Sequence, residues 1–581
     1  MNVKKDGGRV LKWIERHPVP FFIIIATVLE IALELLGRRS FGDFLSYHIY
    51  NMVFVICNIL IITVSLSVSL LFKRRLFMVI ITVSLWIALG IANSFMLAFR
   101  STPLNISDFY MLRFSAKMMI LYVTPVQAAL IFSAIAAAGF LGYIVWRRIP
   151  KQRRAAVKAV PVLFSAMVFI VITSSVSVSA GNYNENSEYS VYDPLYDTYA
   201  ENGFAFSLSM SLFERGMPRP EKYGGETVTK IVDTIEQTSA PDGEMPVYPD
   251  IIMVQLESFF DVNRLAGIDY TENPVPVWSG LRKNYISGYL TVPVIGAGTA
   301  KTEFEILTAM KIKYFEMGEN PYNTVLCDNF CESIASILSE NGYSTAAFHN
   351  NTGAFYDRDK VFPNLGFDSY TALEDMSEVE YNVLGWAKDD ILIDEMMSSL
   401  TDGRDFLFTV TVQAHGRYPD ALTEDAEQYA SLESQGLSDE YNEKGGLSSV
   451  ENAFNYYINE LREVDAFIGR LISEVEKSGS PTVIVFYGDH LPRLNYDCFS
   501  LAEGEINMTE YVIWDNIGLD KNKENIDMFT YQLSPYVLNK LGIAANPIFE
   551  LHSEMRNSPS YEEMLYMLEY DLLYGQKYSQ R

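Results

Sequence analysis

Four apolar runs of this sequence are each followed at once by a side chain that can bind a metal ion or a phosphate. These side chains are Glu257 after residues 251–256, His349 after 344–348, His415 after 406–412, and Asp489 with His490 after 482–487. A lone histidine in such a position is usually a structural residue, but the coincidence of four runs indicates a site. Ligands of open α/β sheets bind outside the carboxyl ends of the strands, so the pattern predicts that all four runs meet at one crevice.

Glu257, Asp489 and His490 form a candidate set of metal ligands. Two carboxylates and an imidazole offer oxygen and nitrogen atoms, which suit Mn²⁺, Mg²⁺ or Zn²⁺ better than a metal that is held by thiolates. None of the four cysteines forms a CxxC pair, so neither a zinc knuckle nor a disulfide framework is indicated. The sequence therefore predicts a divalent cation bound mainly by oxygen.

The glycine-rich segment 296–304 supplies a candidate nucleophile and fourth ligand, Thr299. Its hydroxyl lies at the start of a predicted helix that runs to about residue 310, where backbone N–H groups and the helix dipole favour an alkoxide and a transferred phosphoryl group. Metal coordination would lower the pKa of the hydroxyl further. Thr302 with Glu305 matches a capping box, which assigns Thr302 to structure and Thr299 to chemistry, although the opposite assignment stays open.

The elements that must position these residues alternate between short apolar, β-branched runs and helical periodicity from residue 248 onward. Helices are predicted over residues 331–340, 386–400 and 450–477. Asp389 and Asp390 are interpreted as first-turn charges of the second of these helices. Such alternation favours an α/β domain with a mainly parallel sheet that is covered on both faces.

The first third of the chain has a different character. Five apolar stretches are long enough to span a bilayer, at residues 19–37, 50–72, 76–98, 125–146 and 159–180. Fourteen basic residues flank one set of span ends and five flank the other. The positive-inside rule therefore predicts a multi-pass plasma-membrane protein with a cytoplasmic amino terminus and an extracellular domain after residue 180.

Two carboxylates, Glu30 and Glu34, lie inside the first predicted span, where an ionised group is costly. They indicate either a site for a lipid headgroup or a proton, or hydrogen bonding between helices. Small residues up to Ala180 leave open a proteolytic release of the extracellular part. The predicted organisation is a membrane domain over residues 1–180, a linker over 181–247, a catalytic core over 248–505 and a C-terminal subdomain over 506–581.

Length and charge narrow the class of protein. The 581 residues allow roughly three to five domains. The first 180 residues carry 19 basic and 6 acidic side chains, whereas the remainder carries 26 basic and 66 acidic ones. A domain this acidic repels phosphate backbones, so nucleic-acid binding is excluded for the soluble part, and a phosphorylated substrate would require metal ions.

Taken together, these motifs resemble the lipoteichoic acid synthase family of membrane enzymes, whose extracellular domain has the sulfatase and alkaline-phosphatase-like fold. The resemblance covers the whole layout of five spans, linker and catalytic domain. Its motifs here are Val254-Gln255-Leu256-Glu257-Ser258, Gly298-Thr299 leading to Glu303-Phe304, Phe348-His349-Asn350, His415-Gly416-Arg417-Tyr418, and Tyr487-Gly488-Asp489-His490.

The resemblance implies roles for the residues that match these motifs. Thr299 would be the nucleophile, and Glu257, Asp489 and His490 would bind the metal, for which Mn²⁺ is expected, with Thr299 as a further ligand. The residues that would contact the substrate are His349, Tyr356, Arg358, His415 and Arg417. His415 would protonate the leaving group or donate a hydrogen bond to phosphate. Lys301 is a further phosphate-binding candidate.

The implied activity moves glycerophosphate from phosphatidylglycerol to a glycolipid or polyglycerophosphate acceptor, through a phosphothreonine-type intermediate. Two departures from the better-known members weaken this polymer assignment more than they weaken phosphotransfer. Tyr356 replaces a tryptophan, and the nucleophile loop reads Gly-Thr-Ala-Lys instead of Gly-Lys-Thr-Ser. A phosphoethanolamine or other headgroup transferase and a non-catalytic scaffold or sensor stay as alternatives. A sulfatase is disfavoured because no cysteine has the context that formylglycine formation requires.

Overall fold

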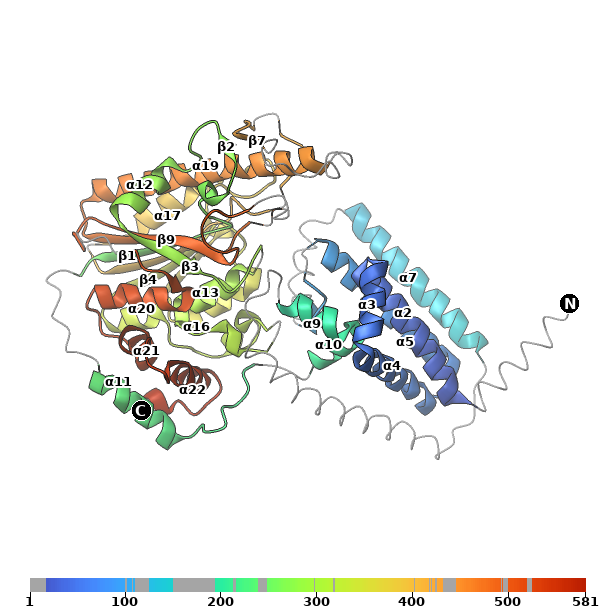
Figure 1. The fold of residues 1–581 in the computed structure, drawn as a ribbon. Helices are drawn as coiled ribbons and strands as arrows, with labels where there is room; N and C mark the ends of the chain where they lie inside the picture. The colour runs from blue at the N-terminus through green and yellow to red at the C-terminus, as the bar shows by residue number, and fades with distance from the viewer. Residues whose placement is uncertain are drawn as a thin grey trace. The chain divides into compact units, whose positions relative to one another are not determined.

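The computed structural model separates the chain into two compact units, residues 1–215 and 216–581 (Figure 1). The residues that it describes are 17–99, 102–106, 108–109, 125–149, 194–212, 216–238, 248–296, 298–316, 319–401, 403–416, 418–419, 421–423, 426–431, 446–492, 494, 500–519 and 525–580.

The first unit is helical. Its helices are α2 (Pro18–Arg38), α3 (Phe41–Tyr50), α4 (Met52–Ser67), α5 (Arg75–Phe99), α7 (Pro125–Arg148), α9 (Pro194–Asn202) and α10 (Phe204–Met210). In the described part of the chain, three stretches are long and apolar enough to cross a membrane, namely Pro18–Arg38, Met52–Leu71 and Arg75–Leu97. They coincide with the first three predicted spans. Helix α7 occupies the fourth predicted stretch, whereas the fifth stretch (159–180) and the expected cleavage point after Ala180 lie outside the described residues.

Polar side chains of the apolar helices hold the segment that contains α9 and α10. Glu34 accepts a hydrogen bond from the backbone N–H of Phe204 at 2.8 Å, and Arg38 donates to the carbonyl of Ala200 at 2.7 Å. Asn58 accepts from the N–H of Phe206 at 2.7 Å. Both oxygens of Glu34 are used, because Arg38 also donates to it at 2.9 Å. The hydrogen-bonding interpretation of Glu34 therefore agrees with the contacts that the structure gives this side chain.

The second unit is built on an eight-stranded sheet. Its strands lie in the order β10 (Met528–Phe529), β3 (Ile286–Thr291), β9 (Met508–Asp515), β8 (Thr482–Gly488), β1 (Asp250–Leu256), β6 (Asp405–Val410), β4 (Ser344–His349) and β5 (Ser369–Ala372). Neighbours pair in parallel except that β9 runs antiparallel to both β3 and β8. The four strands predicted from apolar runs are β1, β4, β6 and β8, which are consecutive in the sheet, and the mainly parallel arrangement is confirmed. A second, two-stranded sheet pairs β2 (Asp269–Tyr270) with β7 (Ala430–Ser431).

Helices cover both faces of the large sheet, so its central strands are buried on both sides (Figure 1). Along β1, Ile251 and Met253 enter one core, while Ile252 and Val254 enter the other. The first core is completed by α11 (Gly225–Thr238), α13 (Thr299–Thr308), α15 (Ile334–Glu340), α20 (Thr530–Lys540), α21 (Pro547–Met555) and α22 (Tyr561–Leu573). The second is completed by α12 (Pro276–Asn284), α17 (Ile391–Ser399) and the long α19 (Gly446–Ser478). The short helices α14 (Val325–Asp328) and α16 (Arg358–Asn364) complete the unit.

Candidate active site

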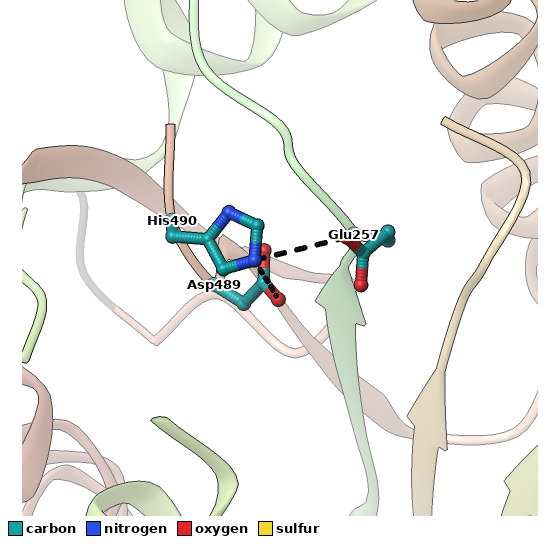
Figure 2. A group of neighbouring side chains, drawn as sticks. All are labelled: Glu257, Asp489 and His490. Atoms are coloured by element: carbon teal, nitrogen blue, oxygen red, sulfur yellow. Dashed lines mark ion pairs between the residues drawn. The ribbon is translucent and has the colours of Figure 1, made fainter. Parts of the chain in front are cut away.

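The register of two central strands brings the first two acidic residues together. Strands β1 and β8 pair in parallel, with Leu256 opposite Gly488. The residues that follow, Glu257 and Asp489, therefore leave the sheet side by side although they lie far apart in the sequence. His490 comes next to Asp489 and its ring points toward Glu257 (Figure 2). This edge of the sheet is the carboxyl edge, as the sequence pattern predicts.

The three side chains form a compact, buried cluster. His490 Nε2 lies 3.4 Å from Asp489 Oδ2 and 3.7 Å from Glu257 Oε1 (Figure 2). One potential ligand atom from each residue lies within 4.8 Å of the others, and all three residues are buried. This is the donor set that the sequence predicts for a divalent cation.

The hydrogen bonds of the cluster leave ligand atoms facing one another. Within the described part of the chain, Asp489 Oδ2 and His490 Nε2 are buried and have no hydrogen-bond partner. His490 Nδ1 lies 3.0 Å from the carbonyl of Leu491, which suits an Nδ1–H donor and leaves the lone pair of Nε2 free for a metal. Burial, together with the nearby charge of Glu257, raises the pKa of Asp489 well above its usual range. A divalent cation fits this site because it would satisfy both atoms and offset the repulsion between the carboxylates.

Thr299 contributes a hydroxyl to the same cluster. Its Oγ1 donates a hydrogen bond to Glu257 Oε2 at 3.1 Å. Thr299 is the first residue of α13, and Gly298 before it has a φ of 101°, which is favourable for glycine. Gln255 of strand β1 donates to the carbonyl of Thr299 at 3.4 Å and so ties the helix start to the strand. The hydroxyl therefore lies at a helix amino terminus beside two carboxylates, as expected of a nucleophile for phosphoryl groups.

The predicted capping box is wrong. Helix α13 begins with Gly298 as its N-cap, four residues earlier than a cap at Thr302 requires. Thr302 instead donates a hydrogen bond to the backbone carbonyl of Asp489 at 2.9 Å. Glu305 accepts from the N–H of Ile312 at 2.9 Å and from the hydroxyl of Thr530. Thr302 therefore has a structural contact, but one that fixes a candidate ligand and not the helix end.

Ser258 is a site residue for which the sequence analysis predicts no role. Its N–H donates to Asp489 Oδ1 and its Oγ donates to Glu257 Oε1, both at 2.8 Å. The backbone carbonyl of Ser258 accepts a hydrogen bond from Tyr457 at 2.7 Å. Its φ of 53° is in the left-handed region that few residues other than glycine adopt. Ser258 thus fixes one oxygen of each carboxylate. Its position directly after Glu257 is the sequence feature that could have indicated this role.

His415 lies near the cluster and is half-buried. It follows the carboxyl end of β6, and its charge lowers the pKa of Glu257, which burial alone would raise. Its ring packs against Trp386, with 4.5 Å between ring centres. Trp386 was predicted to begin a helix, whereas α17 begins at Ile391, because residues 381–387 form a tight hairpin. The aromatic contact on His415 could not be predicted from the sequence.

His349 and Arg358 are both deeply buried. His349 Nδ1 lies 2.8 Å from the carbonyl of Val410, and burial, with the charge of Arg358, lowers the pKa of His349 well below its usual range. Arg358 forms an ion pair with Glu303, in which Nε lies 3.0 Å from Oε2. The guanidinium is therefore engaged with a carboxylate of α13 and is neither at the surface nor free in an open crevice.

Tyr356 lies beside this ion pair. The guanidinium carbon of Arg358 lies 5.3 Å from the ring centre of Tyr356. Tyr356 and Asp357 both have positive φ values, 59° and 55°, so the chain turns sharply before α16. Lys301 is half-buried in the first turn of α13. Arg417 lies outside the described residues.

The prediction that Asp389 is a first-turn helix charge is wrong, because α17 begins only at Ile391. Asp389 is fully buried, and its Oδ1 accepts hydrogen bonds from Asn350 at 2.8 Å and from the N–H groups of Val412 and Gln413 at 3.1 Å. Burial raises its pKa to about 7. Asp390, in contrast, is exposed and pairs with Arg470. Asp389 therefore ties the loop that carries His415 to the end of β4.

Comparison with known proteins identifies the fold family. A protein-family model described as Sulfatase matches residues 249–542, which is half of the chain. This chain belongs to the sulfatase family. The match starts just before β1 and ends after α20, so it includes every member of the cluster around Glu257.

Two curated relatives of this sulfatase-family chain are informative. The chain is 25% identical over 493 residues to a putative cyclic β-1,2-glucan modification protein of Rhizobium meliloti, covering 82% of this chain and 73% of that protein. It is 26% identical over 250 residues to the lipoteichoic acid synthase of Staphylococcus saprophyticus, covering 42% of this chain and 35% of that protein. The resemblance to lipoteichoic acid synthases is thus found by direct comparison.

Solved structures share the fold. A phosphoglycerol transferase from Streptococcus pyogenes, in complex with sn-glycerol-1-phosphate, aligns with a TM-score of 0.54 and 21% identity, over 62% of this chain and 97% of that one. The integral membrane lipooligosaccharide phosphoethanolamine transferase A of Neisseria meningitidis aligns with a TM-score of 0.50 and 16% identity, over 94% of this chain and 97% of that one. The second alignment extends over nearly the whole chain, including the region of the apolar helices.

Proposed function

We propose that this protein is a membrane-anchored, metal-dependent phosphotransferase that takes glycerophosphate from phosphatidylglycerol. The observation that carries the proposal is the convergence of Glu257, Thr299, Asp489 and His490 in one buried cluster. A scaffold or sensor has no need of two unsatisfied ligand atoms aimed at each other beside an aligned hydroxyl. The named activities of the relatives, lipoteichoic acid synthesis and phosphoglycerol transfer, support the choice of a glycerophosphate group.

Glu257, Asp489 and His490 would hold a divalent cation, for which we propose Mn²⁺. When bound, this ion supplies positive charge that neutralises the phosphoryl oxygens and lowers the pKa of the Thr299 hydroxyl. Ser258 keeps the two carboxylates in place through its hydroxyl and its N–H. The first turn of α13 presents backbone N–H groups and the positive end of the helix dipole to the phosphoryl group.

The transfer proceeds in two balanced steps. First, Thr299 Oγ1 forms a bond to phosphorus while the bond between phosphorus and the diacylglycerol oxygen breaks, and the hydroxyl proton is released. His415 supplies a proton to the departing diacylglycerol. Second, the oxygen of an acceptor hydroxyl forms a bond to phosphorus while the bond between phosphorus and Thr299 Oγ1 breaks. The proton of the acceptor passes to Thr299 Oγ1, and His415 regains its proton from solvent. The proposed lining of the glycerophosphate side is His349 and Tyr356, and Arg358 holds Tyr356 from its buried ion pair with Glu303.

The acceptor that we propose is a glycolipid or growing polyglycerophosphate of the lipoteichoic acid type. A glycan acceptor is the second candidate, because a relative whose match covers 82% of this chain is named for cyclic β-1,2-glucan modification. We further propose that the amino terminus is cytoplasmic and the catalytic unit extracellular, since basic residues are concentrated on one set of span ends. Such an orientation keeps the site near lipid substrates of the outer leaflet.

Fluorescent phosphatidylglycerol, incubated with the full-length protein and Mn²⁺, tests the proposal. Release of labelled diacylglycerol is expected from the wild type and from Thr302→Ala, but not from Thr299→Ala. The opposite pattern for the two variants would overturn the assignment of the nucleophile. Consumption of phosphatidylethanolamine in place of phosphatidylglycerol would refute the headgroup and favour the phosphoethanolamine alternative.

A further inference from the structure

An exposed apolar loop adjoins the candidate active site. Among the described residues of the second unit, six large apolar side chains are exposed, and three of them lie within four positions of the chain. These three are Tyr381, Val383 and Leu384, with exposed fractions of 53%, 59% and 37%. The other three are far apart along the chain, whereas these three share one loop and are called the exposed patch, in a unit that is rich in acidic residues.

The loop is built to hold this patch outward. Asn382 Oδ1 accepts hydrogen bonds from the N–H of Leu384 at 3.1 Å and from the N–H of Trp386 at 2.9 Å. The N–H of Gly385 donates to the carbonyl of Asn382 at 2.9 Å, and Gly385 has the positive φ of 84° that this turn requires. The apolar tip is therefore held by a closed turn, so its exposure is a property of the local fold.

The same turn contacts the residues around His415. Trp386, which ends the turn, packs its ring against that of His415. Asn382 donates to the carbonyl of Gln413 at 3.2 Å, two residues before the histidine. A molecule that touches His415 is thus next to Trp386, which follows Leu384 of the patch by two positions in the same turn.

Charge around the loop narrows the class of partner. Glu378 and Glu380 on its flank are exposed, while Lys388 pairs with Glu463. These charges disfavour a contact with phosphate groups, so the apolar side chains suit the uncharged glycerol backbone and acyl chains of a lipid and not its headgroup. The described part of the chain has three helices of membrane-spanning length and composition, which favours a lipid as the molecule that this loop contacts.

We propose that the loop over residues 381–386 contacts the glycerol backbone and upper acyl chains of the phospholipid whose headgroup reaches His415. This inference rests on the proposed function, because it names the part of the lipid substrate that lies outside the phosphoryl site. When the lipid binds, Val383, Leu384 and Tyr381 are shielded from water, which stabilises the complex of protein and lipid. This stabilisation is gained on binding, before the phosphorus–oxygen bond breaks, so it affects KM more than kcat.

A series of phosphodiesters that differ only in their acyl chains tests the proposal with the full-length protein in detergent. The series is glycerophosphoglycerol, dihexanoyl phosphatidylglycerol and dioleoyl phosphatidylglycerol. For the double variant Val383→Ser/Leu384→Ser, the ratio of kcat/KM for the dioleoyl lipid to that for glycerophosphoglycerol is expected to fall about tenfold, mainly through KM. Tyr248→Ser, an exposed aromatic before the amino end of β1, is the control and should keep the wild-type ratio.

A ratio that is unchanged in the double variant overturns the proposal, as does an equal loss on all three diesters. Failure of the wild type to cleave any diester would refute the proposed function. Lipid binding by the loop can still be tested separately, by photolabelling. Phosphatidylglycerol with a photoreactive group in its acyl chain should label a peptide that contains residues 381–386 in the wild type, and much less in the double variant. Labelling that is confined to other peptides contradicts the inference.

Discussion

Replacing Ser258 separates the two ways in which this residue organises the candidate metal site. Ser258→Ala removes the hydroxyl that donates to Glu257 at 2.8 Å but keeps the N–H that donates to Asp489. A hydrogen bond to a charged acceptor contributes about 1.5–3 kcal/mol, and loss of such support for a ligand typically lowers metal affinity about 10–100-fold. Ser258→Gly loses the same hydrogen bond to Glu257. It also relieves the backbone strain of a residue with a side chain at a φ of 53°, which costs about 1 kcal/mol.

Calorimetric titration of Mn²⁺ into the metal-free, full-length protein measures the loss of metal affinity. Thermal unfolding without metal measures the gain from relieving the backbone strain at residue 258. Both variants should bind Mn²⁺ about 10–100-fold more weakly than the wild type. Without metal, Ser258→Gly should unfold at a higher temperature than Ser258→Ala. Ser398→Ala, at a serine of α17 far along the chain from the cluster, is the control. Wild-type affinity for Mn²⁺ in Ser258→Ala would refute the positioning argument.

Three further predictions follow from buried charges and from the metal site. Burial raises the pKa of Asp389 from 3.8 to about 7, so the folded state binds this proton more tightly and the free energy of unfolding should fall as pH rises from about 4 to 7. In Asp389→Asn this decline should be smaller. Identical pH profiles of thermal stability in the variant and the wild type would contradict the raised pKa. Glu303→Gln should lower the free energy of unfolding by about 3–5 kcal/mol, because Arg358 would be left buried without its partner. If the variant unfolds at the same urea concentration as the wild type, the ion pair does not stabilise the fold. Addition of Mn²⁺ at 100 times its Kd to chelator-treated protein should stabilise the second unit by about 2.7 kcal/mol, and no change in its thermal transition would argue against a resident ion.

Much of the fold was predictable because its central strands are buried on both faces. A strand such as β1 appears in the sequence as an unbroken apolar run, and the four runs identified in this way are adjacent in the sheet. Strand β3, which lies between β10 and β9, was missed. It contains Gly288, whose missing side chain allows the backbone carbonyl of Ile526 to approach closely, and such a contact has no local signature.

The candidate ligands were predictable because they directly follow strands, whereas their supporting contacts were not. Ser258 acts through its backbone conformation and Trp386 through a turn that places its ring on His415. Asp389 resembled a first-turn helix charge because its burial depends on loops that end other strands. Tertiary packing of this kind gives no periodic pattern in the sequence.

The central claim is that Thr299 receives the phosphoryl group beside a divalent ion held by Glu257, Asp489 and His490. Mass spectrometry of the full-length protein, after incubation with phosphatidylglycerol and Mn²⁺ in the absence of an acceptor, tests it most directly. A glycerophosphoryl adduct on Thr299 that disappears in Asp489→Asn is the predicted result. An adduct on Thr302, or diacylglycerol release with no adduct on Thr299, would contradict the account.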